Sequence, residues 1–123
     1  MGDQLKVGLE GEARTQVSDQ NTAIACGSGS VPVLATPAMI GLMEMAALSS
    51  VDPLIGPENT TVGSKIEVSH LTATPLGMTV VARSRLVEIE GKRLVFEVEA
   101  RDDVDLKGKG RHERYIVPRE KFL

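Results

Sequence analysis

One apolar segment constrains the fold more than any other part of the chain. It runs from Val33 to Leu48, reads VLATPAMIGLMEMAAL, and contains a single charged residue, Glu44. Thr36 suits the N-cap of a helix, and Pro37 suits the first helical position, where a missing N–H costs nothing. The segment therefore predicts one buried helix, which must be covered on nearly every face because it is apolar on nearly every face.

The flanking sequence indicates where this helix begins and ends. Asp52-Pro53 and Gly56-Pro57 cannot continue it, so we expect it to end near Ser49-Ser50. Residues 18–32, before the helix, are predicted to form a loop or lid that leads into it. The glycines of this lid lack the lysine and the spacing of a phosphate-binding loop.

The rest of the chain has the period of strands. Between Lys6 and Val17, apolar and polar residues alternate cleanly. Four further strands are predicted after the helix, in a mostly antiparallel meander: residues 60–71, 79–90, 94–100 and 110–117. A tight turn at Glu90-Gly91 joins two of them. This order predicts an α+β fold in which a curved antiparallel sheet of about five strands wraps one long central helix.

Length and composition exclude several classes of protein. The chain has 123 residues, which suits a single domain over residues 1–123. Its net charge of -3 and its aromatic content of 2% disfavour nucleic-acid binding. Cys26 is the only cysteine, and the two histidines lack ligand spacing, so we expect no metal site. Without a long apolar span or a signal sequence, we expect a cytoplasmic protein with no membrane partner.

Two residues of the predicted helix are candidates for chemistry. A hydroxyl at a helix start, as at Thr36, lies near free backbone N–H groups that stabilise an oxyanion, although capping alone would also explain a threonine there. Glu44 has apolar neighbours on all sides, which favours a buried carboxylate acting as general base or nucleophile. The alternative for Glu44 is a narrow solvent-facing stripe or an ion pair with an arginine.

A histidine on the next strand is the third candidate. Val62, Ile66 and Val68 occupy even positions, and His70 falls on the same face, which we expect to point toward the helix. There the imidazole could orient a carboxylate or shuttle a proton, while a core histidine with satisfied hydrogen bonds is the alternative. His112, among charged residues of the last strand, is predicted to be solvated or to face substrate.

These residues resemble the motifs of the hotdog-fold acyl-CoA thioesterases, and more narrowly the fluoroacetyl-CoA thioesterase branch. The similar segments are Leu34-Ala35-Thr36-Pro37, Met43-Glu44-Met45-Ala46-Ala47, Thr61-Val62-Gly63, His70-Leu71 and Ala73-Thr74-Pro75 with Gly77. They extend over most of the chain, from about residue 7 to residue 117. A glycine seven residues before the histidine completes the pattern.

The resemblance implies a homodimer whose sheets join and whose active sites lie near the dimer interface, and a tetramer is the alternative assembly. It implies that Thr36, Glu44 and His70 are catalytic and that the backbone of Gly63 lies at the thioester. It implies no cofactor other than the CoA of the substrate. We expect the basic cluster at the last strand, Lys107, Lys109, Arg111 and Arg114, to contact the CoA phosphates, with Arg111 and Arg114 as the main candidates.

The predicted function is hydrolysis of a small or medium acyl-CoA thioester to the free acid and CoA. The main alternative is a non-catalytic acyl-CoA or small-acid binding module on the same fold, and a structural subunit or a dehydratase are further ones. In the fluoroacetyl-CoA branch the lid carries phenylalanines that recognise the fluorinated acyl group. The segment from Ala25 to Val31 has no aromatic residue, so we expect a different acyl group.

Overall fold

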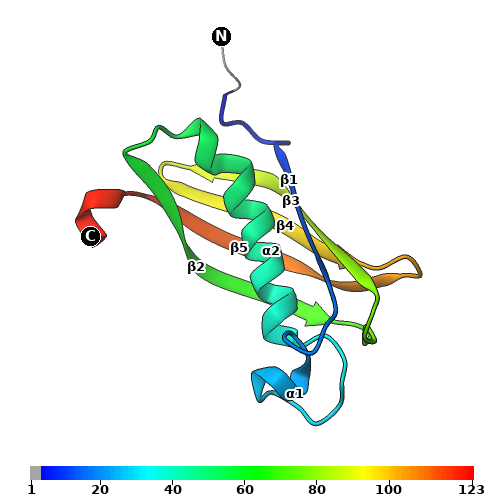
Figure 1. The fold of residues 1–123 in the computed structure, drawn as a ribbon. Coiled ribbons are helices and arrows are strands. Elements are labelled where there is room, and N and C mark those ends of the chain that lie inside the picture. The colour runs from blue at the N-terminus through cyan, green and yellow to red at the C-terminus, as the bar shows by residue number, and fades with distance from the viewer. Residues whose placement is uncertain (1–3) are drawn as a thin grey trace.

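The structure, a computed structural model, describes residues 4–123 and contains one long helix against one sheet (Figure 1). The helices are α1 (Ala23–Cys26) and α2 (Thr36–Val51), with short 3-10 turns at Asp52–Leu54 and Arg119–Phe122. The strands are β1 (Glu10–Gln16), β2 (Asn59–His70), β3 (Thr79–Glu90), β4 (Arg93–Arg101) and β5 (Leu106–Pro118). The predicted helix and the predicted five-stranded sheet are therefore confirmed.

The strands are arranged differently from the predicted meander. The order across the sheet is β1-β3-β4-β5-β2, and every neighbouring pair is antiparallel. Only β3, β4 and β5 form a meander, while β2 lies beyond β5 at one edge and β1 lies at the other. The prediction that β2 leads directly into the meander was wrong, because alternation along a strand does not indicate which strand is its neighbour.

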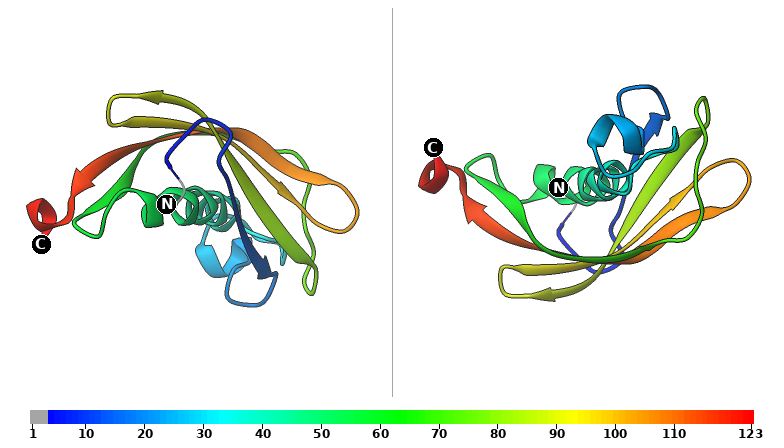
Figure 2. Two further views of the ribbon diagram at one scale, coloured as in Figure 1. Left: turned by 90° about the horizontal axis from the view of Figure 1, so that it is seen from above. Right: turned by 90° about the horizontal axis from the view of Figure 1, so that it is seen from below.

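The sheet covers one side of α2 rather than surrounding it (Figure 2). The buried residues of the helix pack against the inner face of the sheet: Met39, Leu42, Met43, Ala46, Ala47 and Val51. On the other side, Met45 is 56% exposed and Glu44 is partly exposed. The expectation of a helix covered on nearly every face is therefore wrong for the single chain, in which solvent reaches the apolar side chain of Met45 and part of the Glu44 carboxylate.

The bounds of β3 match the sequence prediction, whereas β5 begins four residues before its predicted start at Gly110. Gly108 pairs with His70 on β2 and with Ala100 on β4. A Cβ at Gly108 would lie 2.6 Å from the sulfur of Met39, so the helix packs where a side chain would otherwise stand. Gly108 has no apolar side chain at its inward position, so the alternation of apolar and polar residues that marks a half-buried strand is absent there. For this reason the start of β5 was predicted too late.

Opposite charges alternate across the outer face of the sheet. One row crosses all five strands in register: Glu10, Arg85, Glu97, Arg111 and Glu67. Opposite-charge neighbours across strands stabilise a sheet, and they favour the register that brings them together. This row lies on the face of the sheet that points away from α2, because the inward positions of the same strands are buried.

Candidate functional site

Thr36 is the first residue of α2 and is not its N-cap. Ala35 occupies the cap position, without a side-chain capping bond, and Pro37 follows within the first turn. The hydroxyl of Thr36 lies 2.7 Å from Nδ1 of His70, 34 positions further along the chain. The N-cap prediction was wrong, and the structure shows instead that this hydroxyl is bound to the imidazole.

His70 ends β2 and is half-buried on the inner face of the sheet, as the strand period predicted. Burial lowers the pKa of His70 below its ordinary value, and the Lys107 ammonium lowers it further, while backbone hydrogen bonding at Thr72 acts in the opposite direction. The imidazole is therefore neutral near pH 7. When its proton is on Nε2, Nδ1 accepts a hydrogen bond from the Thr36 hydroxyl.

A β-bulge in β2 changes which side chains face the helix. The register with β5 shifts between Gly63 and Lys65, so that Ser64 is the extra residue. After the bulge, Ile66 and Val68 face inward as predicted. Before it, Thr61 is buried and Val62 is 42% exposed, so the prediction that Val62 faces inward was wrong. An extra residue inverts the alternation, and no local sequence pattern marked it.

Glu44 lies at the middle of α2, directly opposite the bulge. A Cβ on Gly63 would lie 2.9 Å from Oε2 of Glu44, so glycine permits the strand and the carboxylate to approach closely. The same oxygen is 4.0 Å from Nη1 of Arg114, which gives a long ion pair. The side chain of Glu44 is 42% exposed, so the expectation of a buried carboxylate is wrong for the single chain.

Arg114 and His112 form a buried polar cluster behind Glu44. Arg114 donates from Nε to the Thr61 hydroxyl at 2.7 Å and from Nη2 to the Thr61 carbonyl at 3.0 Å. It also donates from Nη1 to Nε2 of His112 at 3.0 Å, while Nδ1 of His112 donates to the carbonyl of Lys65 at 2.8 Å. These bonds require a neutral imidazole, and burial indeed lowers the pKa of His112.

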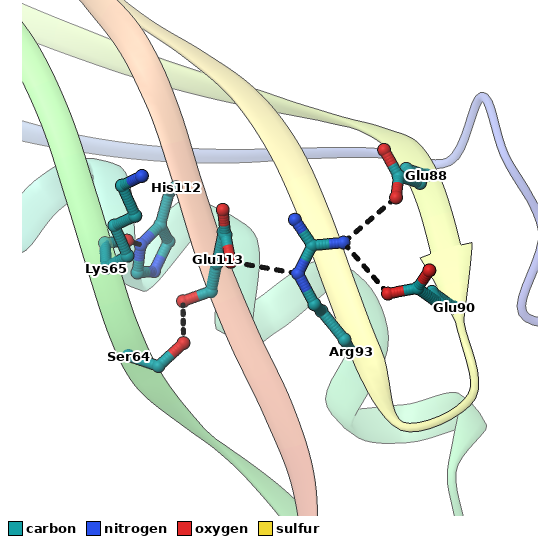
Figure 3. A network of polar contacts seen from close by, with 7 residues as sticks. All are labelled: Ser64, Lys65, Glu88, Glu90, Arg93, His112 and Glu113. Atoms are coloured by element: carbon teal, nitrogen blue, oxygen red, sulfur yellow. Dashed lines mark hydrogen bonds and ion pairs between the residues drawn. The ribbon is translucent and has the colours of Figure 1, made fainter.

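The location of His112 differs from the sequence prediction. It is 1% exposed and its ring packs near that of Phe96, so the prediction of a solvated residue was wrong. Figure 3 shows His112 and Glu113 on opposite faces of β5, with Glu113 paired to Arg93 on the outer face. Arg111 and Glu113, the neighbours of His112 in the sequence, both point to the outer face. Their charges therefore do not indicate where the His112 side chain lies.

The two halves of the predicted site are separated within one chain. Thr36 and His70 lie at the start of α2, whereas Glu44 and Gly63 lie near its middle. Eight helical positions between Thr36 and Glu44 correspond to about 12 Å along the helix axis. A carboxylate and a hydroxyl at this separation do not meet, so one chain holds two candidate half-sites: the Thr36–His70 pair and the Glu44–Gly63 contact.

The other predicted substrate residues lie elsewhere. Arg111 is exposed on the outer face, in register with Glu67 and Glu97. Arg114 is buried, so that it contacts Glu44 rather than bulk solvent. Within residues 4–123, no group of three His, Cys, Asp or Glu side chains is placed to bind a metal ion.

A pocket of about 270 Å³ opens beside the Thr36–His70 pair. Its walls come from the lid and from the segment that follows β2. None of the described helices of residues 4–123 combines the length and apolar character needed to cross a bilayer.

Comparison with known proteins identifies the family. Residues 17–120 match the family model described as FlK, fluoroacetyl-CoA-specific thioesterase. The chain belongs to this family. A fluoroacetyl-CoA thioesterase from Streptantibioticus cattleyicolor is 43% identical over 90 residues, which are 73% of this chain and 65% of that relative. The matched region thus spans less than two thirds of the relative's length.

Solved structures of the family and its relatives share the fold. A point mutant of FlK, in complex with fluoroacetate and CoA, is 35% identical and superimposes with a TM-score of 0.89 over 97% of this chain and 100% of that chain. A thioesterase superfamily member from Thermus thermophilus is 32% identical, with a TM-score of 0.86 over 94% of this chain and 86% of the other. The predicted hotdog fold is therefore confirmed.

Proposed function

We propose that this protein hydrolyses an acyl-CoA thioester to the free acid and CoA. The observation that carries the proposal is the 2.7 Å contact between the Thr36 hydroxyl and His70, placed at a helix start beside a pocket. Membership of the fluoroacetyl-CoA-specific thioesterase family supports the reaction class. The FlK mutant solved with fluoroacetate and CoA supports a CoA thioester as the substrate type.

Each residue has a role that its surroundings support. In one route Glu44 takes a proton from a water molecule that attacks the thioester carbonyl, and the C–S bond then breaks to give the acid and the thiolate of CoA. In the other route Glu44 attacks the carbonyl itself, the C–S bond breaks, and water then hydrolyses the resulting anhydride to release the acid.

When the His70 proton is on Nδ1, it donates to the Thr36 oxygen and leaves the Thr36 hydroxyl free to donate to the substrate carbonyl oxygen. This oxygen then lies near the positive end of α2, where its developing negative charge is stabilised. His70 takes up the proton released by the attacking water and passes it to the departing thiolate, so that the ring is neutral again after the step, and the Gly63 backbone lies at the carbonyl. Neither step requires a metal ion or a redox cofactor.

A homodimer would bring the two half-sites together. β2 is a 12-residue edge strand, and an edge of this length is a template for pairing with a second chain. Met45 lies on the face of α2 that the sheet leaves open, and Glu44 lies beside it at the border with β2, where its side chain is 42% exposed. We infer that a second copy covers this face and places its Glu44 near the first copy's Thr36–His70 pair. Assembly into tetramers stays a prediction of the family resemblance.

The CoA phosphates need a cation on an accessible surface. Arg111 has the exposure for this role, and we retain it as a proposed phosphate contact. Arg114 was proposed for the same role, but its burial supports a different one, in which it holds the Glu44 carboxylate through the 4.0 Å ion pair. The cytoplasmic location also stays a prediction.

The decisive experiment measures thiol release from a panel of acyl-CoAs by the wild type and by Glu44→Ala. We expect turnover by the wild type and a loss of about 10²-fold or more in the variant, as for removal of a general base. Because the Glu44 side chain is partly exposed, the variant should keep its circular dichroism spectrum and melting temperature. Equal turnover by a folded Glu44→Ala protein would refute the mechanism.

The alternative of a non-catalytic binding module predicts a different result. Such a protein would bind acyl-CoA in calorimetry and would release no thiol from any ester. The close Thr36–His70 contact favours catalysis over this alternative, because binding alone does not need a hydroxyl beside an imidazole.

A further inference from the structure

The pocket beside Thr36 and His70 has a preformed backbone frame. Ala23, in the lid, donates its N–H to the Val33 carbonyl at 2.8 Å. Leu34 donates its N–H to the Thr74 carbonyl at 2.9 Å, which ties the entry to α2 to the segment after β2.

A buried ion cluster supports the opposite wall. Nζ of Lys107 donates to the carbonyl of Ala73 at 3.1 Å, and it lies 3.1 Å from Asp102 and 2.8 Å from Asp105. Lys107 and Asp102 have nearly buried side chains, so this clamp is shielded from solvent. The two walls of the pocket are therefore held by separate sets of bonds before any ligand enters.

The volume of the pocket is larger than the volume of a two-carbon acyl group. Since a water molecule takes about 30 Å³ in the liquid, 270 Å³ corresponds to roughly nine groups of that size. An acetyl group would leave most of this space unfilled. Where the ligand does not reach an apolar wall, the van der Waals contacts that would stabilise the bound ligand are not made.

The chemistry of the walls favours an aliphatic occupant. Much of the lining is apolar and of small or medium size: Ala23, Val33, Leu34, Leu71 and Ala73. Ser28 and Thr72 add hydroxyl groups, and Thr36 and His70 form the reactive side. None of the lining residues within the described chain is aromatic. The lining residues of this chain include no lysine, arginine, aspartate or glutamate, and the His70 imidazole is neutral near pH 7, so an acidic acyl group would find no cation among them.

We propose that this pocket receives an uncharged aliphatic acyl group of about four to eight carbons, a size that follows from the volume. The inference rests on the proposed function and names the substrate class of the same site. In this arrangement the thioester carbonyl lies at Thr36 and the chain extends between Ser28 of the lid and Ala73.

The first test measures kcat/KM for acetyl-, butanoyl-, hexanoyl-, octanoyl- and dodecanoyl-CoA. We expect kcat/KM to rise by about fourfold for each added methylene group until the pocket is full, as follows from the free energy of burying one methylene. Dodecanoyl-CoA should be hydrolysed more slowly than octanoyl-CoA. A preference for acetyl-CoA over all longer esters would overturn the inference.

The second test fills the pocket from either wall with Ser28→Phe and Ala73→Phe. Both variants should lower kcat/KM for hexanoyl-CoA by at least tenfold more than they lower it for acetyl-CoA, so the ratio of the two values is the readout. Ala25→Phe is the matched control, because Ala25 is an exposed residue of the same lid outside the pocket lining. Equal loss for all esters in the wall variants would mean that the pocket does not hold the acyl group.

The failure of this inference can be told apart from failure of the proposed function. If no ester is hydrolysed, the thioesterase proposal fails, and calorimetry with acetyl-CoA and hexanoyl-CoA then tests the pocket alone. Tighter binding of hexanoyl-CoA, weakened at least tenfold by Ser28→Phe and unchanged by Ala25→Phe, would support the pocket assignment. Equal affinity of the wild type for both esters would overturn it.

Discussion

Thr36 illustrates how one side chain can be free for chemistry although it stands at a helix start. Its hydroxyl lies 2.7 Å from the His70 ring, and Ala35 takes the cap position without using a side chain. Because the threonine does not cap the helix, its removal should have little effect on folding. Function and stability can therefore be separated at this residue.

The first prediction concerns substitution of this hydroxyl. Thr36→Ala should lower kcat by at least tenfold, the low end of the contribution expected from a positioned catalytic group. Its free energy of unfolding should change by no more than about 0.5 kcal/mol, because Thr36 is exposed and does not cap the helix. Thr36→Ser keeps the hydroxyl and is the matched control. Equal losses in the two variants would argue against a role for the hydroxyl.

The second prediction concerns pH and the two histidines. Burial lowers the folded-state pKa of both His70 and His112, so the unfolded chain binds more protons just below pH 6.5. The two neutral imidazoles make their full contribution to the free energy of unfolding above about pH 6.5. This contribution is lost as the pH falls below 6.5 and through the pKa values of the two histidines in the folded protein. Urea unfolding at pH 7.5 and pH 5 should show the wild type to be less stable at pH 5.

A variant isolates the contribution of the buried ring. His112→Gln should be less stable than the wild type at pH 7.5, since it alters the bonds to Arg114 and Lys65, and its stability should change less between pH 7.5 and pH 5. The carboxylates with lowered pKa, such as Glu113, contribute mainly at more acidic pH. Identical pH dependence of variant and wild type would contradict the assignment of a neutral His112.

At the scale of elements, the bulge in β2 organises the Glu44 half-site. It turns Thr61 and Gly63 inward in the first half of the strand while Ile66, Val68 and His70 face inward in the second half. One strand can therefore supply a close backbone approach to Glu44 and also the histidine partner of Thr36. An unbroken strand would place Gly63 and His70 on opposite faces.

The third prediction follows from this close approach. In Gly63→Ala the new Cβ would lie 2.9 Å from Oε2 of Glu44, 3.2 Å from Cε1 of His112 and 3.4 Å from Nη1 of Arg114. The Glu44 carboxylate is the most mobile of the three groups because it is partly exposed, so we expect it to be displaced. Turnover should fall at least tenfold, and the melting temperature should fall by only a few degrees, as for about 1 kcal/mol.

Ser64→Ala is the control for this prediction. Ser64 is the exposed extra residue of the bulge, and its hydroxyl donates only to the Glu113 carbonyl at 3.2 Å. We expect its turnover to stay within about twofold of the wild type, since loss of an exposed hydrogen bond has little energetic effect. If Gly63→Ala were as active as Ser64→Ala, the proposed place of the thioester at Gly63 would be wrong.

At the scale of the whole molecule, one chain holds two half-sites about 12 Å apart along α2. The open face of α2 and the free edge of β2 are the surfaces on which a second copy would complete them. The row of alternating charges on the outer face of the sheet already pairs within the chain, so it provides little drive for association. We therefore expect the dimer to form through the edge and the helix.

The fourth prediction tests whether two chains share one active site. Thr36→Ala and Glu44→Ala should each lose at least tenfold in turnover alone. When they are unfolded together in equal amounts and refolded, half of the dimers should be mixed, and each mixed dimer should contain one intact site of its two. About a quarter of wild-type activity should return. Refolding each variant separately and then assaying the mixture is the control, and no recovery after joint refolding would mean that each site lies within one chain.

Local sequence patterns were sufficient to predict most of the helices and strands of this protein and two of its candidate residues. The helix α2 follows from its apolar run and from the prolines at its two ends, whereas β3 and the inward positions of β1 follow from apolar alternation. These are properties of neighbouring residues. The same periodicity selected His70, while the unusual carboxylate in an apolar helix selected Glu44.

Only the tertiary structure decided how these parts meet. The bulge at Ser64, the position of β2 beside β5, the burial of His112 and the exposure of Glu44 all depend on contacts between residues far apart in the chain. Burial depends on which surfaces a fold brings together, and strand pairing depends on backbone bonds that every residue can form. For this reason the sequence by itself determined the elements and the candidate residues, and the fold determined their surroundings.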